Sequence, residues 1–412
     1  MVNIIGKNGS DCGIRPPDDI LEKALREYSA ECLPVKKRLS RLEAQYGYRI
    51  GKTKLNDLNN HFGIMSSRKT GKVMSQSVAT SLVIDKLEED IHNRNGPDSV
   101  KTFLAQDGFN IPRDMIRQGL KAHNIHGGAQ RAPSKYRQKI HRTPLYSIGV
   151  GAEFNCDGHE KLSSQALRMG RVGIAVYEFR DKASGRVIKL VAVPNARDSN
   201  TIGHLYLDVV SVCFVLSGFL TRNTRTNLAP DVDTTAWPPF VALTSINNII
   251  AEALWHWMRK TNTGDIERII KLGRTNGIFI PASELHADLF QWLWSKIVQH
   301  HLDEFTQYWN AHRIRKQDKK LLPSGSTPND VYFNPSAYDL ERVSIPVEKE
   351  LIDGLRAEIP VSREDCLRWV SKDFDEMAAW AYQSIGSPAL VAKEGWHIFA
   401  RMVTLLTPYY PL

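Results

Sequence analysis

The stretch Glu153-Phe-Asn-Cys-Asp157-Gly-His159 decides the fold that we expect for this chain. Its apolar and aromatic residues are typical of a β-strand, and the run closes on the carboxylate of Asp157. A second carboxylate, Glu252, lies 252 − 157 = 95 residues later, in an apolar segment with helical spacing. Carboxylates that converge from separate elements can hold divalent metal ions, so these two residues are the first candidates for chemistry.

Length and composition indicate a globular, basic protein. The 412 residues are enough for two or three domains, and the 42% hydrophobic content excludes a disordered chain. The net charge of +9 and the pI near 9.2 suit a polyanionic partner, although a basic protein without one would have the same composition. Five scattered cysteines without a CxxC pair predict neither a disulfide framework nor a zinc finger. No apolar run reaches the roughly 20 residues of a membrane span, so we expect no membrane partner.

Residues 1–126 have the pattern of a basic, helical region. The segment after Gly47 has the spacing of an amphipathic helix, which we expect Thr53 to cap and Gly63 to end. Such a segment resembles the second half of a helix-turn-helix, whose outward face meets phosphates and base edges. The predicted inward residues are Leu55, Leu58 and Phe62, and the predicted DNA-binding residues are Lys52, Lys54 and Asn56.

A second helical set and a basic linker follow. Helices predicted to begin near Ser75, Pro97 and Pro112 repeat the layout, which favours tandem helix-turn-helix units; a plain helical bundle is the alternative. Residues 127–144 are rich in Gly, Arg and Lys, as in a linker that follows a nucleic-acid backbone or in one that is merely soluble. The linker residues predicted to bind DNA are Arg131, Lys135, Arg137 and Lys139.

Residues 145–335 change character and predict an α/β domain. Alternating apolar residues indicate strands near 151–157, 171–180 and 187–194, with a hairpin turn between the last two. A helix over 201–210, capped by Asp198 or Ser199, comes next. Three antiparallel strands followed by a helix are the opening of an RNase H-like fold. Further helices are predicted over 245–260 and the Trp-rich stretch 285–309, whose apolar face we interpret as buried, and the tail 336–412 is predicted to be mainly helical, with no readable role.

Four motifs carry a family resemblance. They are Asp157-Gly-His-Glu-Lys-Leu162, Val193-Pro-Asn195, Ser245-Ile-Asn-Asn-Ile-Ile-Ala-Glu-Ala-Leu-Trp255, and Trp309-Asn-Ala-His-Arg-Ile-Arg-Lys316 followed by Leu322-Pro-Ser-Gly325. Together they resemble integrase-core proteins, specifically the transposon-derived integrase-like family of mushroom-forming fungi. The resemblance implies an RNase H-like core of the retroviral integrase and transposase type. It also implies that Asp157 and Glu252 are the first and third residues of an Asp-Asp-Glu site that holds Mg²⁺ or Mn²⁺.

The second acid of that implied site is missing. The family places it at the end of a fourth strand after the first helix, whereas no acid occurs here between Asp208 and Asp231. Asp208 belongs to the predicted helix, and Asp231 and Asp233 fall in a predicted loop. A deletion, or a mis-joined exon, explains the interval better than a relocated carboxylate. Without one ligand, loss of activity by orders of magnitude is expected.

We therefore expect an RNase H-like protein that binds double-stranded DNA and whose Mg²⁺-dependent strand transfer is impaired. One alternative is a non-enzymatic DNA-binding or interaction protein that reuses the fold. Another is an active recombinase that uses Asp231 or Asp233. Nuclear localisation follows only from DNA as the partner, and a homo-oligomer is expected if the protein is active.

Overall fold

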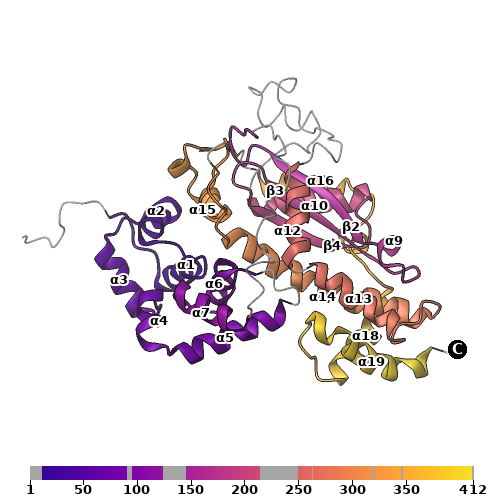
Figure 1. Cartoon of the computed structure of the whole chain (residues 1–412). Coiled ribbons are helices and arrows are strands. Elements are labelled where there is room, and N and C mark those ends of the chain that lie inside the picture. The colour runs from indigo at the N-terminus through magenta and orange to yellow at the C-terminus, as the bar shows by residue number, and fades with distance from the viewer. Residues whose placement is uncertain are drawn as a thin grey trace, which may run out of the picture. The chain divides into compact units, whose positions relative to one another are not determined.

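The computed structural model describes residues 12–90, 95–123, 145–213, 249–261, 263–317, 320–344 and 347–410. These residues form a mixed α/β protein that is mostly helical, which confirms the coarse fold class (Figure 1). The chain divides into two compact units. Unit 1 contains residues 1–146 and 308–341, and unit 2 contains residues 147–307 and 342–412.

The helices predicted after Gly47 and near Ser75, Pro97 and Pro112 are all present in unit 1, whose first part is a series of helices. They are α1 (Asp18–Ala30), α2 (Val35–Tyr46), α3 (Lys52–His61), α4 (Ser67–Val73), α5 (Gln76–Glu89), α6 (Pro97–Gln106) and α7 (Arg113–His123). The short helix α15 (Pro328–Phe333) is added from the later segment.

The first three helices share one apolar core. Leu25 of α1, Leu42 of α2 and Leu55 of α3 are all fully buried in it. Gly63 has φ +66 directly after α3, a left-handed conformation that favours glycine, so the predicted helix stop is confirmed. The predicted cap is wrong: α3 begins at Lys52, because the extended backbone of Gly51 already turns the chain into the helix. Thr53 therefore lies inside the first turn.

The helices α5, α6 and α7 enclose a second, separate apolar core. Val83 of α5, Leu104 of α6 and Ile116 of α7 are buried in it. Ser75 caps α5 by accepting a hydrogen bond from the Val78 N–H. Gly119 of α7 lets the backbone approach Val83 closely, since a Cβ there would lie only 3.3 Å from that side chain. Two three-helix cores in succession are the layout on which the tandem helix-turn-helix prediction depends.

The segment 308–341 packs within unit 1, whereas the sequence groups it with residues 145–335. Polar contacts between distant residues explain the difference. Lys37 of α2 forms an ion pair with Asp330 of α15. The Asn329 amide donates to the carboxylate of Glu31 at 3.0 Å. These partners are nearly 300 residues apart, so no local sequence pattern predicts them.

Unit 2 contains a three-stranded antiparallel sheet in the order β2 (Phe154–Leu162), β3 (Ile174–Asp181) and β4 (Val187–Val193). The three predicted strands are present, with their ends shifted by several residues. The predicted hairpin turn joins β3 to β4, where the Asp181 carboxylate accepts the N–H groups of Gly151 and Ser184, both at 2.8 Å. That buried carboxylate fixes the turn.

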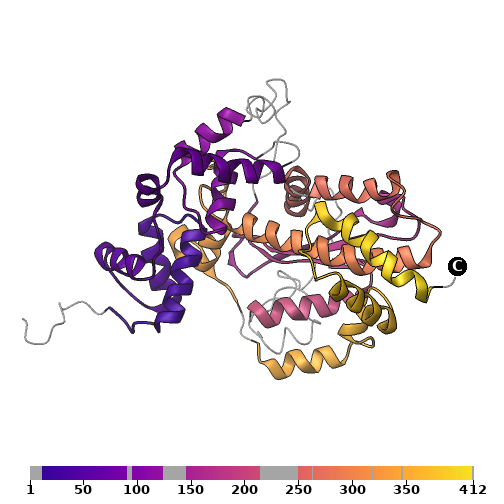
Figure 2. The same cartoon turned by 90° about the horizontal axis from the view of Figure 1, so that it is seen from below.

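Helices cover both faces of this sheet (Figure 2). Successive side chains of a strand point to opposite faces. Tyr177 and Phe179 of β3 belong to a core shared with α10 (Ser199–Cys213) and α16 (Lys349–Ala357). The alternate residues of the strands point to the opposite face of the sheet, where α12 (Ile249–Thr261) packs against β2. Asp198 caps α10 through a 2.8 Å hydrogen bond from the Thr201 N–H, as predicted.

The C-terminal tail packs against the helices of unit 2. Trp396 of α19 (Gly395–Leu406) contacts Trp294 of α14 (Glu284–Ala311), with ring centroids 5.0 Å apart. Its indole N–H donates at 2.7 Å to the Ile269 carbonyl of α13 (Thr263–Thr275). The Trp-rich face of α14 is therefore buried, as expected. Among the described helices, none is both long and apolar enough to cross a membrane.

Candidate functional site

Asp157 lies in the middle of β2, and the prediction that it ends a strand is wrong. The strand continues to Leu162 because Gly158 and His159 pair with Tyr177 and Val176 of β3. Asp157 is half-buried and points to the sheet face that α12 covers. A mid-strand carboxylate on a helix-covered face is held more rigidly than one at a flexible strand end.

Trp255 of α12 ties that helix to Asp157. Its indole N–H donates to Asp157 Oδ2 at 2.9 Å, and its ring stacks on the imidazole of His159 with centroids 4.4 Å apart. Trp255 and His159 are both buried. Because Asp157 and His159 are two residues apart on one strand, they share a face, and one indole contacts both. This arrangement places α12 directly over the carboxylate.

Glu252 lies in α12 one turn before Trp255, and its side chain is outside the described residues. The buried positions Ala251, Trp255 and Met258 mark the packed face of the helix. At about 100° per residue, position 252 lies about 60° from Trp255 around the axis, on the flank beside that residue. The helix backbone therefore places position 252 at the edge of the packed face, next to Trp255.

A third carboxylate, Glu178 of β3, was missed by sequence reasoning. The strand register places Glu178 directly opposite Asp157, and cross-strand partners share a face of the sheet. Glu178 is fully buried. Arg180 is two residues further along the same face; burial lowers the pKa of its guanidinium to about 10, while the nearby Glu178 and Asp181 charges oppose that fall. Only the register of two strands, which no single-strand pattern supplies, could have identified Glu178.

The opposite face of the sheet offers no activated nucleophile among its described residues. Cys156 and Tyr177 both belong to the core shared with α10. Burial raises the pKa of the Cys156 thiol to about 11, which outweighs the lowering effect of its hydrogen bond with Tyr177. Burial also raises the pKa of the Tyr177 hydroxyl. A protonated thiol is a poor nucleophile, so these two groups serve packing.

Asp208 is the last acid before the interval that contains none, and its carboxylate is bound by basic side chains. It lies in α10 as predicted, and its carboxylate accepts from Lys189 at 2.8 Å, Arg356 at 3.0 Å and Arg363 at 2.8 Å. Burial by itself would raise the pKa of Asp208, but the hydrogen bonds and charges of Arg363 and Lys189 hold it at about 2. Asp208 is thus a structural anchor for the tail. The alternative acids Asp231 and Asp233 lie outside the described residues.

The described carboxylates make an incomplete site for a metal ion. Within the described ranges, no group of three or more His, Cys, Asp or Glu side chains is placed to hold one. Asp157 and Glu178 supply hard oxygen ligands of the kind that Mg²⁺ prefers, but Mg²⁺ demands near-octahedral coordination. Trp255 already occupies one Asp157 oxygen, and Arg180 offsets one negative charge. These residues suit Mg²⁺ only if position 252 adds its carboxylate.

The predicted DNA-binding residues of α3 lie on its exposed side. Lys52, Lys54 and Asn56 are exposed, whereas Leu55 and Leu58 of the same helix are buried. The amphipathic pattern of this helix is therefore confirmed. The linker residues Arg131, Lys135, Arg137 and Lys139 lie outside the described residues.

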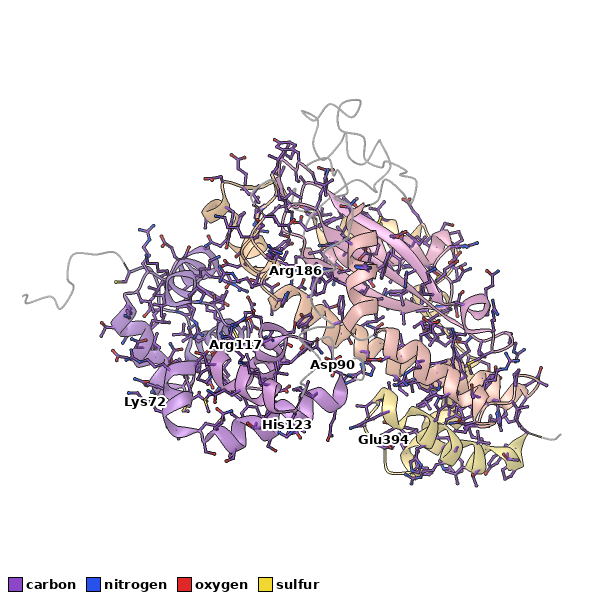
Figure 3. All side chains as sticks on the ribbon, viewed as in Figure 1. Lys72, Asp90, Arg117, His123, Arg186 and Glu394 are labelled. Carbon is purple, nitrogen blue, oxygen red and sulfur yellow. The ribbon has the colours of Figure 1, made fainter. Side chains whose placement is uncertain are left out.

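Neighbouring helices add basic residues that sequence reasoning did not single out. Arg68 and Lys72 on α4, and Arg117 and Lys121 on α7, are exposed; Figure 3 labels Lys72 and Arg117. Lys69 of α4 donates to the amide oxygen of Asn60 of α3, which ties the two helices together. The i, i+4 spacing in each pair was a readable signal, since it places both cations on one face of the helix.

Most of these cations lack an acidic partner. Lys52, Lys54, Arg68, Lys72 and Lys121 form no ion pair with any other residue that the structure describes. Arg117 contacts Asp114 of its own helix at 3.5 Å. Exposed, uncompensated cations of this kind attract a polyanion.

No protein-family model, no curated protein and no solved structure matches this chain. The resemblance to integrase-core proteins therefore rests on the quoted motifs alone and stays a prediction.

Proposed function

We propose that this protein is an integrase-like DNA-binding protein whose metal-dependent strand-transfer activity is impaired. Unit 1 would bind duplex DNA through the exposed faces of α3, α4 and α7. Unit 2 would be an RNase H-like core that retains two of the three expected carboxylates. Nuclear localisation belongs to the same proposal, because DNA is the partner.

One observation carries the proposal: the hydrogen bond from Trp255 to Asp157. The resemblance assigns the first carboxylate to a strand and the last to a helix 95 residues later. The structure packs that helix on that strand, one helical turn from position 252. The order of the elements adds support, since three antiparallel strands and then α10 precede it. Packing of the helix that carries position 252 on the strand that carries Asp157 is the arrangement that the resemblance requires.

Impaired catalysis follows from the charges near Asp157. Two metal ions about 4 Å apart need several carboxylates to neutralise and orient them. Among the described residues on this face, Asp157 and Glu178 supply two carboxyl groups, and Arg180 beside them is a cation. Asp208 is held by three cations in the layer on the other side of the sheet. A bound Mg²⁺ would supply Lewis-acid chemistry, with Asp157 and Glu252 as its proposed ligands.

The test measures DNA binding and strand cleavage on the same preparation of the full chain. A gel-shift titration with duplex DNA, together with nicking of supercoiled plasmid in Mg²⁺ or Mn²⁺, separates the two functions. We expect duplex binding, and nicking no faster than that of the Asp157→Asn variant. His300→Gln, an exposed polar change on α14, is the matched control for handling.

Two outcomes would contradict the proposal. Metal-dependent nicking that disappears in Asp157→Asn would mean an active recombinase, with an acid such as Asp231 or Asp233 completing the site. Absence of duplex binding at low salt would remove DNA as the partner and leave the fold without the proposed function.

A further inference from the structure

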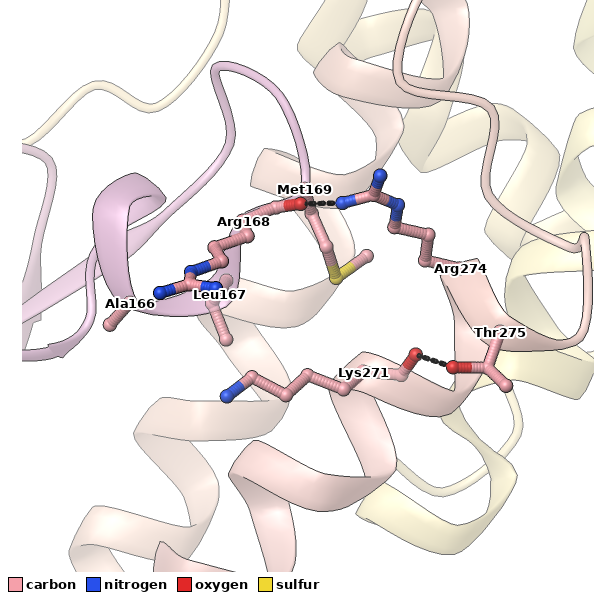
Figure 4. Close-up of a pocket in the computed structure, with 7 residues that line it drawn as sticks. All are labelled: Ala166, Leu167, Arg168, Met169, Lys271, Arg274 and Thr275. Atoms are coloured by element: carbon pink, nitrogen blue, oxygen red, sulfur yellow. Dashed lines mark hydrogen bonds between the residues drawn. The ribbon is translucent and has the colours of Figure 1, made fainter.

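We propose that a basic hollow between α9 (Ser164–Leu167) and α13 of unit 2 binds phosphate groups of a duplex DNA backbone (Figure 4). This inference rests on the proposed function, because it takes DNA as the ligand. It concerns a surface of unit 2 that contains none of the four quoted motifs and none of the candidate carboxylates.

The hollow has a volume of about 580 Å³ and a strongly cationic lining. Arg168 follows α9, and Lys271 and Arg274 project from α13 (Figure 4). The remaining lining residues are neutral: Ala166, Leu167, Met169 and Thr275. Three cations around one open hollow repel each other, and an anion bound between them relieves that repulsion.

Arg168 is held in an unusual backbone conformation at the rim. Its φ is +54, in the left-handed region that glycine and asparagine adopt far more readily than arginine. The Arg274 guanidinium donates a hydrogen bond to the Arg168 carbonyl, which fixes this conformation. An arginine kept where glycine would fold more easily points to a use for its side chain.

Lys271 retains a positive contribution although it has one acidic neighbour. Its ammonium pairs with Glu267, one turn earlier on α13, at 2.5 Å, and its side chain stays 42% exposed. With Glu267 counted, the three cations leave a net charge of +2 at the hollow. Arg268 is exposed three residues before Lys271, so the positive face of α13 continues beyond the hollow.

The hollow lies beyond one end of the strand that carries Asp157. From Asp157 to the end of β2 at Leu162 is five residues, or about 17 Å along a strand. That length spans about five base-pair steps of duplex DNA, at roughly 3.4 Å each. Because α9 begins two residues after Leu162, a duplex that contacts unit 2 beside this end of β2 can place phosphates at the hollow.

The test uses a double variant that should weaken DNA binding without lowering the stability of the fold. Arg168→Gly removes a cation and relieves the left-handed strain, and Lys271→Gln removes a second cation. Arg274 is kept because it supports the local backbone. We expect an unchanged or higher Tm, together with weaker duplex binding by the full chain. The slope of log K against log salt should become shallower by about 1.8, since each phosphate contact contributes about 0.9.

The matched control is Lys349→Gln/Lys393→Gln, which removes two exposed lysines from other helices of unit 2. The proposal predicts a wild-type salt slope for this control. Equal slopes for R168G/K271Q and the wild type would overturn it. So would equal weakening by both double variants, because net charge alone would then explain the change.

Two further arms separate this inference from its alternatives. Inorganic phosphate at constant ionic strength should compete poorly with the duplex; saturable competition that R168G/K271Q abolishes would show a small-anion site and overturn the assignment to DNA. Loss of binding in α3 variants with a wild-type slope in R168G/K271Q would overturn this inference and leave the proposed function standing. The reverse pattern would support the hollow and contradict the role proposed for α3.

Discussion

On α3, α4 and α7 of unit 1, lysines and arginines are exposed and mostly lack acidic partners among the described residues, whereas on the sheet of unit 2 Asp157 and Glu178 are covered by packing. The exposed cations of unit 1 cost the folded state little free energy, because water solvates them. The covered carboxylates of unit 2 need a hydrogen-bond donor or a positive charge inside the protein, which Trp255 and Arg180 supply in part. The cations of unit 1 are therefore accessible to the polyanion that we propose as its partner, while the carboxylates of unit 2 contribute first to its own packing.

The largest effect is expected where a buried charge loses its partner. Arg41 of α2 forms a bidentate ion pair with Glu31 at 2.5 and 3.0 Å, and both residues are buried. Arg41→Met should lower the free energy of unfolding by about 3 to 5 kcal/mol, because it leaves the Glu31 charge uncompensated. Urea denaturation of the full chain measures the change. Addition of Glu31→Gln to the variant should restore most of the loss; no restoration would mean that lost packing on Tyr28 and Phe333, not charge, dominates.

The next largest effect is expected at the exposed lysines of α3. Lys52→Glu/Lys54→Glu should weaken duplex binding by roughly 10- to 100-fold at low salt, with Tm nearly unchanged, because both side chains are exposed. The matched control, Lys23→Glu/Lys36→Glu, reverses two exposed lysines on α1 and α2. Fluorescence anisotropy with a labelled duplex gives the affinities. Equal losses in the two variants would show that net charge, rather than the α3 surface, sets the affinity.

A smaller effect is expected at the contact between α12 and β2. Trp255→Phe keeps a ring over His159 but removes the N–H that donates to Asp157. Loss of a hydrogen bond to a charged group should lower the free energy of unfolding by about 2 kcal/mol. Trp257→Phe, at a more exposed position of α12, should cost less. Equal costs in the two variants would mean that the bond to Asp157 does not anchor the helix.

The smallest effect concerns pH. The pKa of Asp208 is held at about 2, below its ordinary 3.8, so its ion pairs stabilise the fold fully above pH 3.8. That contribution, about 1 to 2 kcal/mol, should be lost as the pH falls from about 4 to about 2. Asp208→Asn should flatten this part of the curve of unfolding free energy against pH. A curve with the wild-type slope would assign the acid dependence to other carboxylates.

Local patterns predicted most of the elements but not their partners. Helical spacing located α3 and α5 to α7, and alternation located the three strands, because these signals lie within a few residues of each other. The length of β2 was misjudged, since its last residues are held by pairing with β3. Gly51 rather than Thr53 is the N-cap of α3, because a cap depends on backbone conformation as well as on residue type.

The candidate site was only partly predictable for the same reason. Asp157 and the helix of Glu252 were found from their flanking residues, and the structure packs that helix on that strand. Glu178 enters only through strand register, and two of the three cations on Asp208, Arg356 and Arg363, come from the tail, more than 140 residues away. The position of the segment 308–341 depends on similar distant pairs.

The central claim, that unit 1 presents a surface for duplex DNA, is tested most directly by the salt dependence of binding. The measurement is the affinity of the full chain for a short duplex between about 50 and about 200 mM NaCl. We predict that log K falls linearly with log salt, and that Lys52→Glu/Lys54→Glu makes the slope shallower by about 2. Binding that does not change with salt, or a slope that this variant leaves unaltered, would contradict the claim.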